Sequence, residues 1–107
     1  MKRVIVTGAA DGIGWATAQR LAHDGWRVAL LDLDVAAVGD RARTLGPLHV
    51  GLGCDVSDEA QVENCVQALL RDWGGVDALV NNAGIGDQSQ PTVTQSVAAF
   101  DRVLSVH

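Results

Sequence analysis

Two periods of apolar residues alternate along this chain. Short continuous apolar runs, typical of strands buried on both faces, lie at about residues 3–7, 27–31, 48–52 and 77–81. Longer stretches with apolar residues three or four positions apart, typical of helices, lie at about residues 12–23, 34–45 and 57–73, with another from about 94–96 onward. Strands that alternate with helices predict an α/β fold with one parallel sheet and right-handed crossovers.

The helical stretches carry signals for their faces and their ends. We expect the first helix to bury one face, formed by Ile13, Ala16, Thr17 and Leu21. The second helix is expected to start at an Asp34 cap and the third at a Ser57 cap, since both side chains can accept hydrogen bonds from a first helical turn.

Composition narrows the class of protein. The 107 residues suit one small domain, and a hydrophobic content of 48% is enough for a core. The net charge of −5, without a cluster of Lys or Arg, argues against nucleic acid or an anionic membrane as partner. No apolar run approaches the roughly 18 residues of a membrane span, and the N-terminus lacks a signal-peptide pattern, so we expect a cytoplasmic protein. Cys54 and Cys65 lack metal-ligand spacing and are interpreted as reduced, so no metal site is predicted.

The first strand leads into a glycine-rich turn and then into a helix. Gly8, Gly12 and Gly14 form the pattern G-x-x-x-G-x-G. Such a turn gathers free backbone N–H groups and the positive end of a helix dipole, which together suit a pyrophosphate. Gly8 would permit the tight turn, Gly12 the approach of the phosphate and Gly14 close packing of helix on strand. A plain loop is the alternative, but the strand before and the helix after favour a nucleotide site.

Acidic residues accompany this turn. Asp32 ends the second strand, eighteen residues after Gly14. An acidic residue at that point of a dinucleotide fold accepts hydrogen bonds from the adenosine ribose, and its charge repels a 2′-phosphate. Asp11 adds negative charge near the same end of the site, so both residues favour NAD over NADP. An ordinary turn aspartate is the alternative for Asp32.

Two further strands end in small or polar residues. Asp55 and Val56 would hold the amino group and the face of an adenine, although Asp55 taken alone is better interpreted as a turn residue. Asn81-Asn82-Ala83-Gly84 permits close approach of a ligand, and an asparagine there can tie neighbouring strands, although a plain turn is the alternative. The carboxyl ends of parallel strands meet at one edge of the sheet, where open α/β folds bind ligands.

These motifs, in this order and at these intervals, closely resemble the short-chain dehydrogenase/reductase family over essentially the whole chain. The resemblance implies one Rossmann domain over residues 1–107, with strand order 3-2-1-4, and a nicotinamide dinucleotide at the carboxyl edge. It implies hydride transfer between the nicotinamide and a small-molecule alcohol or ketone. Members that prefer NADP often carry a basic residue just before the second glycine, where this sequence has Asp11, which supports NAD.

The resemblance also assigns cofactor-binding roles to particular residues. Positions 8–14 would hold the pyrophosphate, Asp32 the adenosine ribose, and Asp55 with Val56 the adenine. Asn81, Ala83 and Gly84 would lie along the ribose of the cofactor. The implied cofactor-binding set is therefore Gly8, Asp11, Gly12, Ile13, Gly14, Asp32, Asp55, Val56, Asn81, Ala83 and Gly84.

The sequence departs from the family pattern in its catalytic residues. The family moves protons with a serine and a Tyr-x-x-x-Lys pair placed well beyond residue 107, whereas this chain has no tyrosine and only Lys2 as a lysine. His107 stands where an active-site asparagine is expected, so a relay through imidazole and a lost relay both stay open.

We therefore expect the cofactor-binding half of an NAD-dependent oxidoreductase, truncated and incomplete at the edge of its fourth strand. A non-catalytic NAD-binding module and an inactive fragment are the alternatives. Association into a homo-oligomer also stays open.

Overall fold

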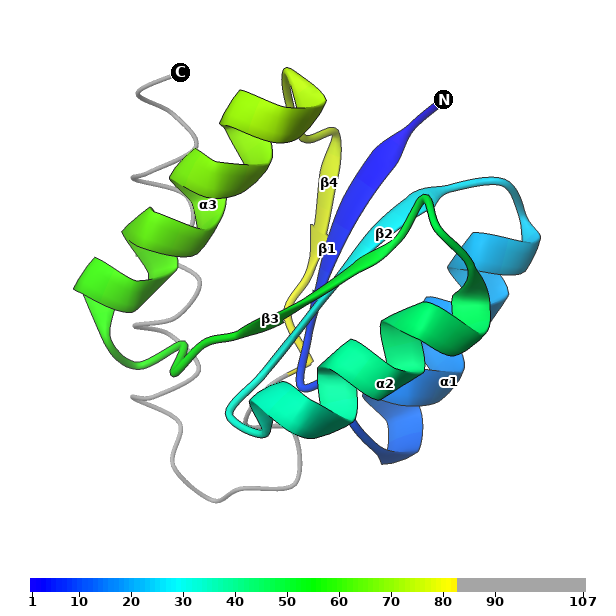
Figure 1. The fold of residues 1–107 in the computed structure, drawn as a ribbon, viewed down its shortest axis with the longest axis horizontal. Coiled ribbons are helices and arrows are strands. Elements are labelled where there is room, and N and C mark those ends of the chain that lie inside the picture. Colours follow the sequence, from blue (N-terminus) through cyan, green and yellow to red (C-terminus); the bar gives the residue numbers. More distant parts are fainter. Residues whose placement is uncertain (83–107) are drawn as a thin grey trace.

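The computed structural model describes residues 1–82, so the predicted last helix and the predicted site residues Ala83, Gly84 and His107 lie outside the described part. The elements follow one another as β1 (Arg3–Thr7), α1 (Gly12–His23), β2 (Arg27–Asp32), α2 (Val35–Leu45), β3 (Val50–Gly53), α3 (Glu59–Trp73) and β4 (Ala78–Val80). The strands form one parallel sheet in the order β3-β2-β1-β4 (Figure 1). The predicted α/β fold and strand order are confirmed.

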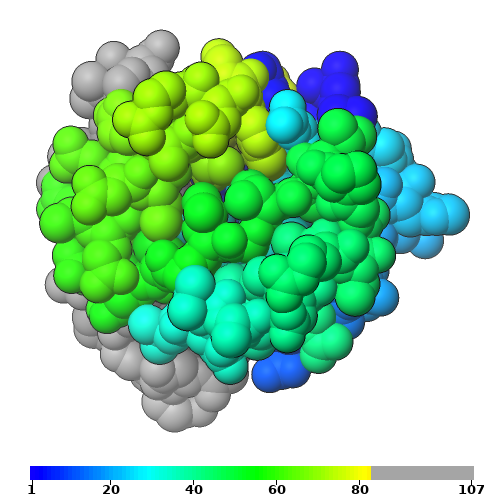
Figure 2. All heavy atoms as spheres, in the orientation of Figure 1, coloured from blue at the N-terminus to red at the C-terminus, as the bar shows by residue number. Residues whose placement is uncertain are grey.

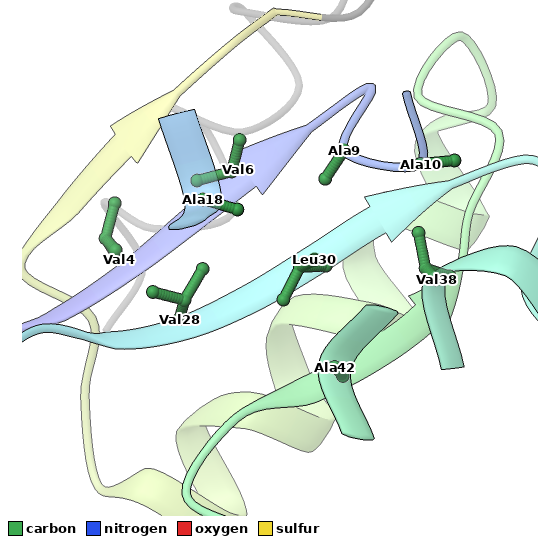
Figure 3. Packing of buried hydrophobic residues seen from close by; sticks show 9 residues of the cluster. All are labelled: Val4, Val6, Ala9, Ala10, Ala18, Val28, Leu30, Val38 and Ala42. Carbon is green, nitrogen blue, oxygen red and sulfur yellow. The ribbon is translucent and has the colours of Figure 1, made fainter. Parts of the chain in front are cut away.

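Helices cover both faces of this sheet. The ribbon view places α1 and α2 on one side and α3 on the other (Figure 1). Successive residues of a strand point to opposite faces, so Ile5 packs in the cluster that includes α3, whereas Val4 and Val6 pack in the cluster under α1 and α2. Figure 3 shows this second cluster, in which the loop residues Ala9 and Ala10 join the strand and helix side chains.

Burial differs between the central and the edge strands. In β1 and β2 four residues of each strand are buried, whereas β4 has none and β3 is half-buried or exposed throughout. Figure 2 shows atoms of β3 at the surface between α2 and α3. Within residues 1–82, β4 pairs with β1 and with no second strand, as expected for the edge of this sheet.

The buried face of α1 agrees only in part with the prediction: Leu21 packs partly buried against the cluster under α1 and α2, as expected, but two of the predicted residues do not. Ile13 is 66% exposed and Ala16 is exposed, whereas Gly14 and Ala18 are the residues buried against the sheet. The reason is close packing: a helix that approaches a strand this closely has room for small residues at the contact and none for Ile13. The large apolar residue is thereby left at the edge of the sheet.

Two element boundaries also differ from the prediction. Asp58, and not Ser57, caps α3, because the Asp58 carboxylate accepts hydrogen bonds from the Ala60 and Gln61 backbone N–H groups while the Ser57 hydroxyl donates to Asp55. The third strand starts at Val50 and not at residue 48, because the His49 imidazole accepts the Val28 N–H in place of a strand partner, at 3.0 Å. The Asp34 cap of α2 is confirmed.

The described helices are all too short or too polar to cross a membrane.

Candidate functional site

The start of α1 leaves backbone donors without a partner inside the helix. Asp11 occupies the N-cap position, yet its carboxylate accepts no hydrogen bond from the first turn of α1. The first backbone bond of the helix runs from the Trp15 N–H to the Asp11 carbonyl. By helix geometry, the N–H groups of Gly12, Ile13 and Gly14 therefore remain available to an acceptor outside the helix. This is the arrangement that binds phosphate groups at helix N-termini.

Two glycines of the turn meet different physical demands. Gly12 has a φ of +58°, and a Cβ added there would meet nothing within 4 Å, so the space in front of it is open. A Cβ on Gly14 would lie 1.9 Å from the Gly8 carbonyl oxygen and 2.7 Å from Nδ2 of Asn82. Gly14 is thus required by packing inside the protein, whereas Gly12 faces the space that a ligand would use.

On the β2 side, Asp32 fastens the turn to the sheet. Its half-buried carboxylate accepts the Ala10 N–H through Oδ2 and the Asp34 N–H through Oδ1, each at 3.1 Å. The Ala9 N–H donates to the Leu31 carbonyl at 3.2 Å. A carboxylate oxygen accepts more than one hydrogen bond, so these contacts leave capacity for ribose hydroxyls.

On the β4 side, two asparagines hold the same turn. The buried Thr7 hydroxyl donates to Oδ1 of Asn81 at 2.8 Å, and Nδ2 of Asn82 donates to the Gly8 carbonyl at 3.4 Å. Nδ2 of Asn81 is buried and has no hydrogen-bond partner among residues 1–82. Through its bond with Thr7, Asn81 links the end of β4 to the end of β1, as expected for an asparagine at this strand end.

The end of β3 brings Asp55 and Val56 to the same edge. Gly53 pairs with Asp32 in the sheet, and the Cys54 N–H donates to the Asp32 carbonyl at 2.9 Å. Oδ1 of Asp55 accepts the hydroxyl and the backbone N–H of Ser57, which lowers the pKa of the Asp55 carboxyl. Val56 packs partly buried against the α3-side cluster.

The two cysteines are free thiols, as the sequence indicated. A hydrogen bond with Cys65 and burial raise the pKa of the Cys54 thiol.

Sequence reasoning missed several residues at this edge. Leu33, in the turn after β2, is 74% exposed, and Val35, the first residue of α2, is 63% exposed. Val35 lies three residues before Val38 in α2, so helical periodicity would assign it to the apolar face and gives no sign of its exposure. Asn82 stood in the noted motif, but its contact with Gly8 depends on β4 lying beside β1. Arg41, from α2, also reaches the turn, where its Nε donates to the Ala10 carbonyl.

Comparison with known proteins identifies relatives of this chain. The family model described as enoyl-(acyl carrier protein) reductase matches residues 8–107. Sorbitol dehydrogenase from Cereibacter sphaeroides is 37% identical over 106 residues, which are 99% of this chain and 41% of that protein. The chain spans about two fifths of the length of such curated relatives.

Solved structures agree with the sequence relatives. A short-chain dehydrogenase/reductase from Burkholderia phymatum in complex with NAD superposes with a TM-score of 0.84 at 32% identity, covering 98% of this chain and 43% of that one. Pseudomonas aeruginosa RhlG in an NADP active-site complex gives a TM-score of 0.81 at 31% identity, covering 96% of this chain and 44% of that one. The order of the strands, the glycine turn at their carboxyl edge and these matches agree: the chain belongs to the short-chain dehydrogenase/reductase family.

Proposed function

We propose that this chain binds a nicotinamide dinucleotide along the carboxyl edge of its sheet, with NAD preferred to NADP. The bound nicotinamide supplies the acceptor or donor of a hydride, and the residues of this chain bind and orient it. The protein to which it contributes would oxidise an alcohol or reduce a ketone of a small molecule, a substrate class suggested by the similarity to sorbitol dehydrogenase.

The observation that carries the proposal is the uncapped start of α1. Three backbone N–H groups at residues 12–14 lack helical partners, and no Asp11 side-chain bond satisfies them. A pyrophosphate would satisfy these donors and would lie at the positive end of the α1 dipole. The open space at Gly12 fits the same ligand, because it lets phosphate oxygens approach the backbone.

The preference for NAD rests on the position of Asp32. Its carboxylate lies against the glycine turn through Ala10, where the adenosine ribose of a dinucleotide bound by α1 would lie. A second negative charge from a 2′-phosphate would be repelled there, whereas two ribose hydroxyls would donate to the carboxylate. Asp55, Val56 and the exposed Leu33 would then lie around the adenine.

Residues 1–82 would bind and orient the cofactor and would transfer no proton, and a relay through His107 stays a prediction. A tyrosine, which the family uses for that step, does not occur in this sequence. Binding of NAD without catalysis is therefore the second candidate function for the chain acting alone. A cytoplasmic location and homo-oligomerisation stay predictions.

A matched pair of glycine substitutions tests the proposal. Gly12→Ala and Gly25→Ala each add a Cβ to a residue with positive φ, +58° and +95°, with nothing within 4 Å of the added atom. Each should cost on the order of 1 kcal/mol in backbone conformation. At Gly12 alone, the methyl group would enter the space of the pyrophosphate.

The measurement is the dissociation constant of NADH, followed by nucleotide fluorescence, with thermal unfolding as a check of folding. We expect Gly12→Ala to weaken NADH binding at least about tenfold, a loss of roughly 1.4 kcal/mol. Gly25→Ala should leave the constant within about twofold, because it lies at the opposite end of α1. Equal effects of the two substitutions, or no saturable NADH binding by the unsubstituted protein, would contradict the proposed site.

A further inference from the structure

A guanidinium from α2 reaches the outer side of the glycine turn. Nε of Arg41 donates to the Ala10 carbonyl at 3.1 Å, and its Nη2 lies 3.6 Å from Oδ1 of Asp11. The Arg41 guanidinium also lies over the Trp15 ring, 4.9 Å from the ring centroid. Arg41 therefore contacts a loop residue, the N-cap of α1 and a residue of its first turn.

This guanidinium is close to the ribose end of the proposed site. The peptide groups of Ala10 connect the two contacts, since its N–H donates to Asp32 while its carbonyl accepts from Arg41. Asp32 and Arg41 thus approach the turn at the same residue from two sides. A shallow pocket of about 260 Å³ opens beside this residue, and its lining includes Asp11 and Arg41.

The contacts of Arg41 are of two kinds. The bond to the Ala10 carbonyl and the stacking on Trp15 fix where the guanidinium lies, and neither depends on Asp11. The ion pair with Asp11 neutralises the charge of the Arg41 guanidinium. Another anion can replace Asp11 in this pair, because the Asp11 side chain is 90% exposed and that of Arg41 is 40% exposed. Without Asp11, the guanidinium would keep its place and would lack an anion.

We propose that Asp11 and Arg41 form a selectivity latch, in which Asp11 occupies a guanidinium that would otherwise bind the 2′-phosphate of NADP. This inference rests on the proposed dinucleotide site and assigns part of its selectivity to a residue of α2. In the unsubstituted protein Arg41 acts as a positioning residue, because it holds Ala10 and its charge is paired with Asp11. Removal of Asp11 alone makes it a phosphate ligand, since guanidinium binds phosphate through paired, charge-assisted hydrogen bonds.

The test is a double-substitution cycle with NADPH and NADH dissociation constants as the readout. The proteins are unsubstituted, Asp11→Asn, Arg41→Met and the double variant, each checked for folding by thermal unfolding. Arg41→Gln serves as a second variant in case Arg41→Met does not fold. Asp24→Asn is the matched control, because Asp24 pairs with Arg20 at 3.1 Å on the same helix, away from the turn.

We expect Asp11→Asn to tighten NADPH binding about tenfold, the strength of one charge-assisted hydrogen bond to phosphate. NADH binding should change less, so the NADPH/NADH ratio shifts, and the gain should shrink as salt concentration rises. In the Arg41→Met protein the same substitution should tighten NADPH binding by less than about threefold. The control should leave the ratio unchanged.

Two results would overturn the latch, and they are distinguishable from each other. An equal gain from Asp11→Asn with and without Arg41 would mean that Asp11 repels the 2′-phosphate directly. A protein that binds neither nucleotide, in any variant, would overturn the proposed function together with the latch.

Discussion

The two sides of the glycine turn are held by groups of opposite character. On the β2 side, a carboxylate, Asp32, accepts a hydrogen bond from the Ala10 N–H. On the β4 side, an amide of Asn82 donates to the Gly8 carbonyl, and Thr7 joins Asn81 between the strands. The β2 side therefore brings negative charge to the turn, whereas the β4 side brings neutral groups that fix its shape.

This difference separates two tasks. The shape of the turn is needed by any dinucleotide, because it directs the N–H groups of residues 12–14 outward. The charge on the β2 side distinguishes dinucleotides, because only that side meets the 2′ position in the proposed binding mode. Substitutions on the β4 side should change stability and overall affinity, whereas those on the β2 side should change the ratio of NADPH to NADH affinity.

The largest effect is expected at Gly14, which touches the β4 side. Gly14→Ala would place a methyl group 1.9 Å from the Gly8 carbonyl oxygen, so the turn has to move. We expect a loss of about 3 kcal/mol in the free energy of unfolding, measured with urea, and loss of binding for both nucleotides. Gly39→Ala is the control, because its Cβ would meet only Nη1 of Arg43, at 3.7 Å. That substitution in a helix interior should stabilise by up to about 1 kcal/mol.

Thr7→Val tests the neutral side. The substitution leaves Oδ1 of Asn81 without the Thr7 hydroxyl in a buried place, which should cost about 1–3 kcal/mol of unfolding free energy. The NADPH/NADH affinity ratio should stay constant, since no charge changes. Thr17→Val, which removes an exposed helical hydroxyl contact to Ile13, is the matched control and should cost less. A changed NADPH/NADH affinity ratio in Thr7→Val would contradict the proposed difference between the β2 side and the β4 side of the turn.

Asp32→Ala tests the charged side. We expect NADH binding to weaken and the NADPH/NADH affinity ratio to rise by about tenfold, or roughly 1.4 kcal/mol. Asp34→Ala is the control. The Asp34 carboxylate caps α2 by accepting the Ala37 N–H at 3.0 Å, so this substitution should cost about 1 kcal/mol of unfolding free energy. The ratio should not move in Asp34→Ala. An equal shift of the ratio in both variants would remove Asp32 from the selectivity argument.

The smallest effect is expected at Asp55, and it concerns how the free energy of unfolding decreases as pH falls. Ser57 lowers the pKa of the folded Asp55 carboxyl, so this group contributes stability above its unfolded pKa of about 3.9 and loses it as pH falls through the folded pKa. Ser57→Ala removes one of the two donors. The unfolding free energy of Ser57→Ala should be lower than that of the unsubstituted protein. This difference should be larger at pH 7 than at pH 3. The same shortfall at both pH values would show that Ser57 acts without Asp55.

Local sequence patterns predicted the strands, the helices and their order in the sheet well. The glycine turn, the acidic end of β2 and the Asn81 strand end are short segments whose conformation depends on neighbours in sequence. Their meeting at one edge follows from parallel strands, and the register that pairs Thr7 with Leu31 and Val6 with Val80 bears this out. The roles of these residues toward a cofactor remain a prediction.

Contacts between elements could not be predicted in the same way. Ile13 was expected to be buried because it shares a helical spacing with Thr17 and Leu21. Close packing instead selects Gly14 and Ala18, which carry almost no hydrophobic signal. The Arg41 contact with Asp11 joins residues thirty positions apart on two helices. Nothing in either local sequence indicates that pairing, since it depends on how α1 and α2 lie on the sheet.

The most direct test of the central claim is the chemical shift of backbone amides as NADH is added to the ¹⁵N-labelled protein. Our account predicts large, saturable shifts for the amides of Gly12, Ile13 and Gly14, and small shifts for Gly25 and Gly74 at the far ends of their helices. Saturation should give one dissociation constant for all three amides. Shifts that avoid residues 12–14 while NADH binds would contradict the account, because the start of α1 would then not be the pyrophosphate site.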